Sequence, residues 1–197
     1  LIPPQTKDVL DLCSAPGGKA MQLAAAGHRL TAVDSSEQRL DRLRENLERT
    51  KLSAELVAAD VLQWNPGRKY DAILLDAPCS ATGTFRRHPE VLYRARPRVI
   101  AEASELQSKL LGRAAEWVKG GGVLVYSVCS LEPSEGEAVV RDFLAGNPDF
   151  DTSPLEPGEL PGFLTPAPDG WVRILPDLLE GEGGLDGFLT ARLVRRG

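Results

Sequence analysis

Short apolar runs alternate with helix-like segments along most of this 197-residue chain. Apolar runs bounded by Gly, Pro, Ser or Asp are typical of buried strands, and leucines at helical spacing are typical of amphipathic helices. The strands are expected at residues 9–12, 29–34, 54–59, 72–75 and 123–126. The helices are expected at residues 19–26, 37–49, 99–119 and 134–144. This alternation indicates an α/β fold with a doubly wound parallel sheet.

Glycine, proline and serine mark the ends of several segments. Ser35 or Ser36 would cap the second helix, and the three glycines at 120–122 would end the third helix as a C-cap. The tail of the chain is rich in Pro and Gly. Within it, residues 171–175 and 188–194 have the pattern of two strands, which we expect to pair as a terminal hairpin.

Composition excludes several classes of protein. A hydrophobic content of 42% is ordinary for a globular domain, and a net charge of −5 argues against a surface that binds polyanions all over. No apolar stretch is long enough to span a membrane, and no segment resembles a signal peptide. The three cysteines are widely spaced and form no CxxC motif, so we expect neither disulfides nor a metal site. We expect a cytoplasmic protein with one domain over residues 1–197.

One segment is strongly basic in spite of the negative net charge. Residues 85–100 contain five arginines and a single acid, Glu90. A local basic strip can position a phosphate backbone, and Arg86, Arg87 and His88 are the candidate RNA contacts. The alternative is an arginine-rich loop that is merely solvated.

Two cysteines follow apolar runs that end in small-residue turns. Cys79 ends the segment Ala72-Ile-Leu-Leu-Asp-Ala-Pro-Cys79, and Cys129 ends the segment Val123-Leu-Val-Tyr-Ser-Val-Cys129. Ligands of open α/β sheets bind outside the carboxyl ends of the strands. If these two strands are neighbours, both thiols face one crevice, where sulfur can do chemistry. The alternative is that both are buried structural cysteines.

The acids and the glycine-rich turn at other strand ends suggest a cofactor. The turn Leu12-Cys-Ser-Ala-Pro-Gly-Gly-Lys19 lacks both the GxGxxG fingerprint and the P-loop pattern, but its small residues let the backbone approach a ligand closely. Three other strands end at a carboxylate, namely Asp34, Asp60 and Asp76. This set suits a ligand with a ribose, an exocyclic amine and a positive centre, which favours S-adenosyl-L-methionine. Taken singly, each acid could be a helix N-cap or a solvated strand end.

Five motifs carry a resemblance to a known family. Leu10-Asp-Leu-Cys-Ser-Ala-Pro-Gly-Gly-Lys19, Asp76-Ala-Pro-Cys-Ser80 and Tyr126-Ser-Val-Cys-Ser130 resemble the signature motifs of RNA (cytosine-5) methyltransferases. Ala81-Thr-Gly-Thr-Phe-Arg-Arg-His-Pro89 and Gly184-Leu-Asp-Gly-Phe188 are similar to the bacterial Sun subgroup (Fmu, or RsmB-type), whose substrate is small-subunit ribosomal RNA. The resemblance covers residues 9–195, which is nearly the whole chain.

The resemblance implies a Rossmann-like methyltransferase fold with a seven-stranded sheet in the order 3-2-1-4-5-7-6, the last strand antiparallel. It assigns the ribose hydroxyls of S-adenosyl-L-methionine to Asp34 and the adenine amine to Asp60. Asp76 would lie near the cofactor's amino group and the target base. The methionine end of the cofactor would be held by Cys13, Ser14, Ala15, Pro16, Gly17, Gly18 and Lys19.

The same resemblance gives the two thiols different roles. Cys129 would attack C6 of cytosine and Cys79 would assist release of the adduct, whereas DNA cytosine methyltransferases use the cysteine of a Pro-Cys motif, here Cys79. We expect helix N-termini near both cysteines to favour the thiolate. The chain has Val128 where the family usually has Thr, which puts a hydrogen bond from that position in doubt.

Other readings of the substrate remain open. The subgroup carries an N-terminal RNA-binding region that we expect to be missing from this chain, so the chain alone would bind RNA poorly. The same chemistry on tRNA is one alternative, and DNA is disfavoured because no large target-recognition insert is evident. A catalytically silent RNA-binding module is the alternative from another class. The sequence leaves the oligomeric state open.

Overall fold

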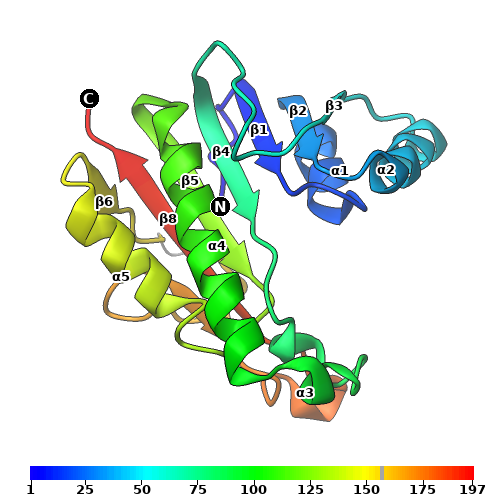
Figure 1. The fold of residues 1–197 in the computed structure, drawn as a ribbon, viewed down its shortest axis with the longest axis vertical. Helices are drawn as coiled ribbons and strands as arrows, with labels where there is room; N and C mark the ends of the chain where they lie inside the picture. Colours follow the sequence, from blue (N-terminus) through cyan, green and yellow to red (C-terminus); the bar gives the residue numbers. More distant parts are fainter. Residues whose placement is uncertain (156–157) are drawn as a thin grey trace.

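The computed structural model describes residues 1–155 and 158–197, which fold around one mixed β-sheet (Figure 1). The parallel part consists of β1 (Asp8–Leu12), β2 (Arg29–Asp34), β3 (Glu55–Ala58), β4 (Tyr70–Asp76) and β5 (Val118–Val128). The last strand, β8 (Phe188–Arg195), is antiparallel to β5. Two short strands, β6 (Phe150–Thr152) and β7 (Val172–Ile174), pair antiparallel with β8. The strand order is β3-β2-β1-β4-β5-β8-β6.

This topology confirms the expected α/β doubly wound fold and the expected strand order, with β8 in the place of the seventh strand. The expected number of seven strands is wrong, because the sheet formed by residues 1–155 and 158–197 has eight. The additional strand exists because β8 is long enough to pair with two segments, β7 at residues 188–190 and β6 at residues 193–195. The pairing of β7 with β8 confirms the predicted terminal hairpin.

The helices are α1 (Gly18–Ala25), α2 (Glu37–Thr50), α3 (Val91–Arg94), α4 (Pro97–Glu116) and α5 (Glu137–Gly146), with short 3₁₀ turns η1 (Thr82–Thr84) and η2 (Glu180–Glu182). In Figure 1, α4 and α5 lie side by side in front of β4, β5 and β8, whereas α1 and α2 lie at the other end of the sheet, beside β2 and β3. Ser36 caps α2 as predicted, because its hydroxyl oxygen accepts a hydrogen bond from the Arg39 N–H at 3.3 Å.

The alternation of side chains along β1 divides the core into two layers. Leu10 and Leu12 pack in a cluster with residues of α4 and α5, and Val9 packs in a second cluster with residues of α1 and α2. Successive side chains of a strand point to opposite faces of the sheet. The helices therefore cover both faces, as a doubly wound sheet requires.

The prediction that the glycines at 120–122 form a helix C-cap is wrong. Helix α4 already ends at Glu116, and the glycines lie within β5. Trp117 is buried with its ring edge-on to Trp64, and Val118 is buried and pairs with Tyr70. Because these two apolar residues belong to the core, the strand starts before the glycines, which fall where the β4–β5 register shifts.

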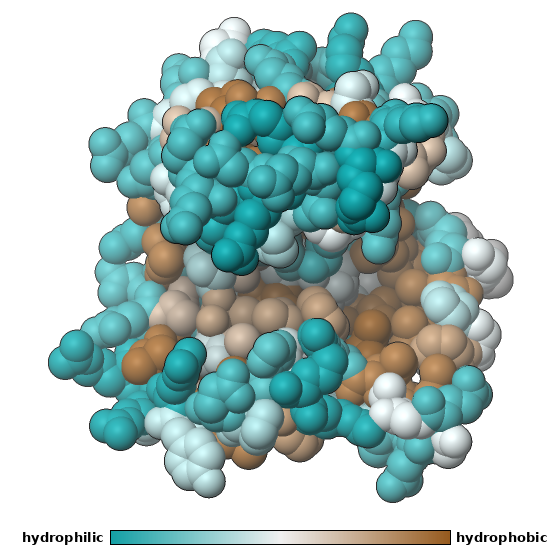
Figure 2. Space-filling model, turned by 90° about the vertical axis from the view of Figure 1, so that its right-hand side faces the viewer, coloured by the Kyte–Doolittle hydropathy of each residue, from teal (hydrophilic) through white to brown (hydrophobic). Residues whose placement is uncertain are grey.

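The carboxyl ends of β1, β2, β4 and β5 lie at one edge of the sheet because these strands are parallel. Figure 2 shows the side of the molecule that carries α1 and α2, and a hollow with apolar surface crosses it between two hydrophilic regions. The hollow lies below α1 and α2, at the level where β4 ends in Figure 1. Within residues 1–155 and 158–197, no helix has the length and apolarity needed to cross a membrane.

Candidate active site

Cys79 and Cys129 meet at the carboxyl ends of β4 and β5. The strands are neighbours, with Asp76 paired to Ser127, and the Ala77 N–H donates to the Ser127 carbonyl at 2.9 Å. The Cys79 Sγ lies 3.4 Å from the Cys129 Sγ, and both side chains are half-buried free thiols. The structure thus confirms that the two strands are adjacent and that both thiols occupy one site.

The pKa values of the two thiols are shifted in opposite directions. The contact with Cys79 lowers the pKa of Cys129, against the opposing effect of burial. The same contact, followed by burial, raises the pKa of Cys79 strongly. Of the two thiols, Cys129 is therefore the one that ionises more readily. The expectation that helix N-termini favour both thiolates is wrong, because α5 begins only at Glu137 and only the three-residue η1 follows Cys79.

Asp76 and Lys19 form an ion pair beside the thiols. The Lys19 Nζ lies 2.7 Å from the Asp76 Oδ2, with both side chains about one-third exposed (35% and 34%). The Lys19 ammonium also lies 5.2 Å from the centre of the Phe188 ring. Lys19 lowers the pKa of Cys129 and Asp76 raises it, so both charges act on that thiol. The structure brings these two predicted site residues together with Cys129.

The turn at residues 13–19 is pinned to the end of β2. The Ser14 N–H donates to the Val33 carbonyl at 3.1 Å, and the Ala15 N–H donates to the Asp34 Oδ2 at 3.1 Å. Gly17 is the N-cap of α1 and has φ +104°, and a Cβ at this position would lie 2.1 Å from the Leu43 Cδ1. Glycine is therefore required here both by the backbone conformation and by the close approach of α2.

A cavity of about 160 Å³ opens beside this turn. Its lining consists of Cys13, Asp34, Ser35, Arg39, Ala59, Asp60, Val61, Pro78, Leu106 and Leu110. Asp34 is buried, accepts a second backbone hydrogen bond from the Ser36 N–H at 3.0 Å, and pairs with Arg39 at 3.3 Å. Asp60 accepts from the Leu62 N–H at 2.9 Å. The two acids thus face one cavity, although nearby groups already occupy part of their hydrogen-bonding capacity.

Asp11 is a site residue that the sequence analysis missed. It is fully buried within β1, and its Oδ2 accepts a hydrogen bond from the Ser14 hydroxyl at 2.5 Å. Its Oδ1 has no partner among the described residues. Burial raises the pKa of Asp11 to about 7, and the nearby charges of Asp76 and Asp34 add to the effect. The sequence did offer one sign of this role, because Asp11 is an acid between the apolar residues of a predicted strand.

Cys13 differs from the other two cysteines. Burial raises its pKa to about 12, so it remains a neutral thiol under ordinary conditions. Its side chain packs against the core cluster that contains Leu10 and Leu12. Within the described ranges, no group of three or more His, Cys, Asp or Glu is arranged to hold a metal ion.

Arg86 and Arg87 anchor the tail of the chain. Arg86 donates to the Pro176 carbonyl at 2.9 Å and to the Gly183 carbonyl, and Arg87 pairs with Asp186. The motifs at residues 81–89 and 184–188 therefore form one structural unit.

His88 belongs to the first of these motifs, and its Nδ1 lies 3.4 Å from the Glu90 Oε1.

Gly83 joins that unit to the thiols. Its N–H donates to the Cys129 carbonyl at 3.0 Å, and its carbonyl accepts from the Gly187 N–H at 2.7 Å. A Cβ on Gly83 would lie 2.0 Å from the Gly187 carbonyl oxygen. The backbone segments approach so closely that only glycine fits.

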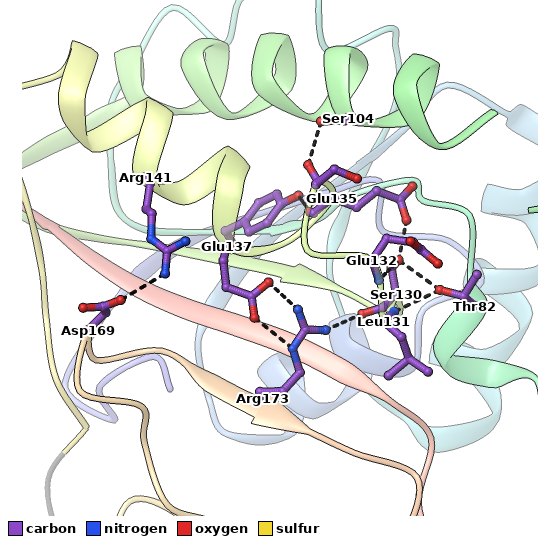
Figure 3. A network of polar contacts seen from close by, with 12 residues as sticks. Thr82, Ser104, Ser130, Leu131, Glu132, Glu135, Glu137, Arg141, Asp169 and Arg173 are labelled. Atoms are coloured by element: carbon purple, nitrogen blue, oxygen red, sulfur yellow. Dashed lines mark hydrogen bonds and ion pairs between the residues drawn. The ribbon is translucent and has the colours of Figure 1, made fainter. Parts of the chain in front are cut away.

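A buried polar network centred on Glu135 lies behind the cysteine turns (Figure 3). Glu135 is fully buried and accepts hydrogen bonds from Ser80 and Ser130. These serines directly follow Cys79 and Cys129. The sequence analysis did not single out Glu135, because a glutamate six residues after a cysteine has no distinctive pattern.

Comparison with known proteins places these features in a family. Residues 1–194 match the family described as 16S rRNA methyltransferase RsmB/F. Ribosomal RNA small subunit methyltransferase B of Klebsiella pneumoniae is 42% identical over 201 residues, which cover 100% of this chain and 44% of that protein. The chain thus spans less than half the length of this curated relative.

Solved structures share the fold. A methyltransferase homologue from Pyrococcus horikoshii superimposes with a TM-score of 0.77 at 32% identity, covering 98% of this chain and 63% of that chain. NSun6 from the same organism, crystallised with SFG, gives a TM-score of 0.83 at 27% identity, covering 98% of this chain and 49% of that chain. The expected methyltransferase fold is confirmed.

Proposed function

This chain belongs to the 16S rRNA methyltransferase RsmB/F family, and on that premise we propose that it methylates C5 of cytosine in small-subunit ribosomal RNA with S-adenosyl-L-methionine. The observation that carries the chemistry is the Cys79–Cys129 pair, 3.4 Å apart, in which only Cys129 has a lowered pKa. Cytosine C5 is a weak nucleophile, and addition of a thiolate at C6 activates it. A site with one thiolate and one protonated thiol meets that requirement.

The residues around the glycine-rich turn fit the proposed cofactor. The cavity beside Asp34 and Asp60 combines carboxylates with apolar walls, which suits a ribose and an adenine. The Asp11 Oδ1 lacks a partner in the described part of the chain, and Asp76 is partly exposed, so both carboxylates can face a cationic amino group. When bound, S-adenosyl-L-methionine supplies an electrophilic methyl group on its sulfonium.

Cys129 is the nucleophile of the proposed reaction. Its thiolate forms an S–C6 bond, and the electron pair of the C5–C6 double bond moves into the ring, where Asp76 shares a proton with N3. C5 then accepts the methyl group. The proton that C5 still carries leaves to a base, the electrons of that C–H bond re-form the C5–C6 double bond, and Cys129 departs as a thiolate.

Cys79 suits the second half of this sequence. Its pKa is raised mainly by its contact with the ionised Cys129. Once Cys129 has formed the S–C6 bond, it no longer carries that negative charge, so the pKa of Cys79 falls. Cys79 can then lose its proton to water and, as a thiolate, take the proton that leaves C5 during release of the adduct. The order of events thus follows from the electrostatics of one pair.

The basic segment at residues 85–100 would contact the RNA. Arg86 and Arg87 are engaged with the tail, although half or more of the Arg87 side chain is exposed. Arg94 and Arg96 are exposed and form no ion pair among the described residues, and Tyr93 beside them is 82% exposed. Free guanidinium groups next to an exposed ring suit a splayed single strand of RNA. His88 belongs to the same segment.

The thiol pair also bears on where the protein works. Two free thiols at 3.4 Å can become oxidised, and the proposed chemistry needs both of them reduced. A reducing compartment such as the cytoplasm, where ribosomal RNA is made in bacteria, satisfies this requirement.

Transfer of labelled methyl groups tests the proposal. We expect the 197-residue chain with labelled S-adenosyl-L-methionine to methylate cytosine in small-subunit ribosomal RNA, and Cys129→Ala to abolish the transfer. Ser108→Ala is the control and should keep activity, because Ser108 is exposed on the surface of α4. Methyl transfer to tRNA but not to ribosomal RNA would show that tRNA is the substrate. RNA binding without any transfer would support a silent binding module and contradict the proposal.

A further inference from the structure

We propose that Glu135 is a positioning residue that holds the two cysteine turns at the spacing that couples their thiols. The inference rests on the proposed function for its catalytic readout and on geometry alone for the rest. A single side chain contacts the residues that follow both cysteines, although those residues are 50 positions apart in the sequence. The two strand ends are thereby linked outside the β-ladder.

The Glu135 carboxylate bridges the two cysteine turns. The Glu135 Oε1 accepts a hydrogen bond from the Ser80 N–H at 2.8 Å, and its Oε2 accepts from the Ser80 hydroxyl at 2.5 Å. The same Oε2 accepts from the Ser130 hydroxyl. Because each serine is covalently adjacent to a cysteine, a shift of Glu135 would move both thiols relative to each other.

Glu135 is itself held in place (Figure 3). The Tyr126 hydroxyl donates to the Glu135 backbone carbonyl at 2.6 Å. Glu135 is fully buried, as is Tyr126, so neither can exchange these contacts for water. The carboxylate is therefore fixed from its backbone as well as through its oxygens.

Residues other than Glu135 also hold the turn after Cys129. Arg173 of β7 donates to the Ser130 carbonyl at 2.7 Å and pairs with Glu137 of α5. The Thr82 hydroxyl oxygen accepts from the Leu131 N–H at 2.9 Å and lies 3.2 Å from the Ser130 hydroxyl. Glu135 is thus the one member of this set that contacts both cysteine turns through its carboxylate.

Energetics favours a positional role over a purely stabilising one. The oxygens of Glu135 accept only from neutral N–H and O–H groups, and no cation pairs with the carboxylate among the described residues. A buried carboxylate without a cation is a costly way to stabilise a core compared with a well-packed apolar side chain. Three donors converging on it instead fix the relative position of two loops.

The test compares Glu135→Gln with Glu132→Gln. Glu132 lies in the same turn, and its side chain makes no contact that links the cysteines, which makes it a matched control. Gln keeps the shape of Glu135 but offers an N–H₂ where two hydroxyls now donate. Alkylation of Cys129 by iodoacetamide is followed against pH by peptide mass spectrometry, and methyl transfer is measured in parallel.

We expect Glu135→Gln to move the alkylation midpoint of Cys129 to higher pH, because the Cys79 hydrogen bond weakens when the turns separate. The negative charge of Glu135 raises the pKa of Cys79, so removing that charge alone would make Cys79 a stronger donor and would lower the alkylation midpoint of Cys129 instead of raising it. We expect kcat to fall about 100-fold with KM little changed, since a shift of about 1 Å has this cost. Glu132→Gln should match the wild type in both assays.

A second variant keeps the inference falsifiable if Glu135→Gln fails to fold. Ser130→Ala alone removes one donor to the Glu135 carboxylate and should also move the alkylation midpoint of Cys129 to higher pH. Ser130→Ala combined with Glu135→Gln should lose no more activity than the worse single variant, because both act through one bridge. Unchanged alkylation and kcat in folded Glu135→Gln would overturn the inference, as would equal losses in Glu132→Gln. If the midpoint moves but the wild-type chain transfers no methyl group, the proposed function fails and the positioning role stands.

Discussion

The two halves of the site are held together in different ways. In the half built on β1 and β2, Asp34 and Asp60 are held by backbone N–H groups that lie close to them in the sequence, such as those of Ser36 and Leu62. In the half built on β4 and β5, the contacts join residues about 50 apart, as in Cys79 with Cys129. The first half is held by contacts between residues fewer than 20 apart, such as the Ala15 N–H with Asp34, whereas the second forms only when β4 and β5 are assembled.

This difference implies that the two halves can be damaged separately. A change in the thiol half should disturb strand assembly and catalysis together, and a change in the acidic half should weaken cofactor binding while leaving the thiol pair intact.

Gly83→Ala should be the most damaging. The new Cβ would lie 2.0 Å from the Gly187 carbonyl oxygen and 3.0 Å from that of Cys129, so backbone must move on both sides. Overpacking of this kind costs about 3 kcal/mol of unfolding free energy, and methyl transfer should be lost. Chemical denaturation measures the stability. Gly112→Ala, in α4 with nothing within 4 Å, is the control and should be neutral or stabilising.

Asp34→Ala should separate the two halves. It removes an acceptor from the N–H groups of Ala15 and Ser36, which costs about 1–3 kcal/mol, and it should weaken binding of S-adenosyl-L-homocysteine in calorimetry. The pH profile of Cys129 alkylation should not change, because Asp34 makes no contact with the thiol pair. A shifted profile would show that the halves are coupled and would contradict the comparison.

Asp11→Asn should change the pH dependence of stability. The folded-state pKa of Asp11, about 7, lies above its ordinary value of 3.8, so the folded state holds the proton more tightly than the unfolded state. Unfolding free energy should therefore fall as pH rises from about 4 to about 7, by at most about 1.4 kcal/mol per pH unit. Asp11→Asn should lose this slope, and the exposed Asp41→Asn should keep it. An unchanged slope in Asp11→Asn would mean that another group causes it.

Arg94→Ala combined with Arg96→Ala should have the smallest effect on the fold. Both side chains are exposed, so unfolding free energy should change by less than about 0.5 kcal/mol. RNA affinity should fall and become less sensitive to salt, because two phosphate contacts are lost. Filter binding at several salt concentrations measures this. Arg44→Ala on α2 is the matched control, since Arg44 is a surface arginine outside the basic segment.

The same contrast explains what the sequence could predict. The parallel strands and the Ser36 cap follow from local patterns. The meeting of Cys79 with Cys129 also needed the strand order that the family resemblance implied. Asp11 was missed because a strand pattern does not show that one oxygen of its buried carboxylate lacks a partner among the described residues.

Contacts between residues far apart in the sequence could not be predicted, because they depend on how the chain folds. Charge alone marked Arg86 and Arg87 as candidate RNA contacts, but their partners in the tail lie 90 or more residues away. Glu135 has its role only because Ser80 and Ser130 are brought together by the β4–β5 ladder. The glycines at 120–122 were misassigned because the burial of Trp117 depends on Trp64, which is distant in the sequence.

Trapping of a covalent protein–RNA complex is the most direct test of whether Cys129 attacks and Cys79 assists release. Cys79→Ala, incubated with small-subunit ribosomal RNA and S-adenosyl-L-methionine, should accumulate a protein–RNA adduct that survives denaturing electrophoresis. Cys129→Ala and the double variant should form none. An adduct formed by Cys129→Ala through Cys79 would reverse the roles and contradict the account.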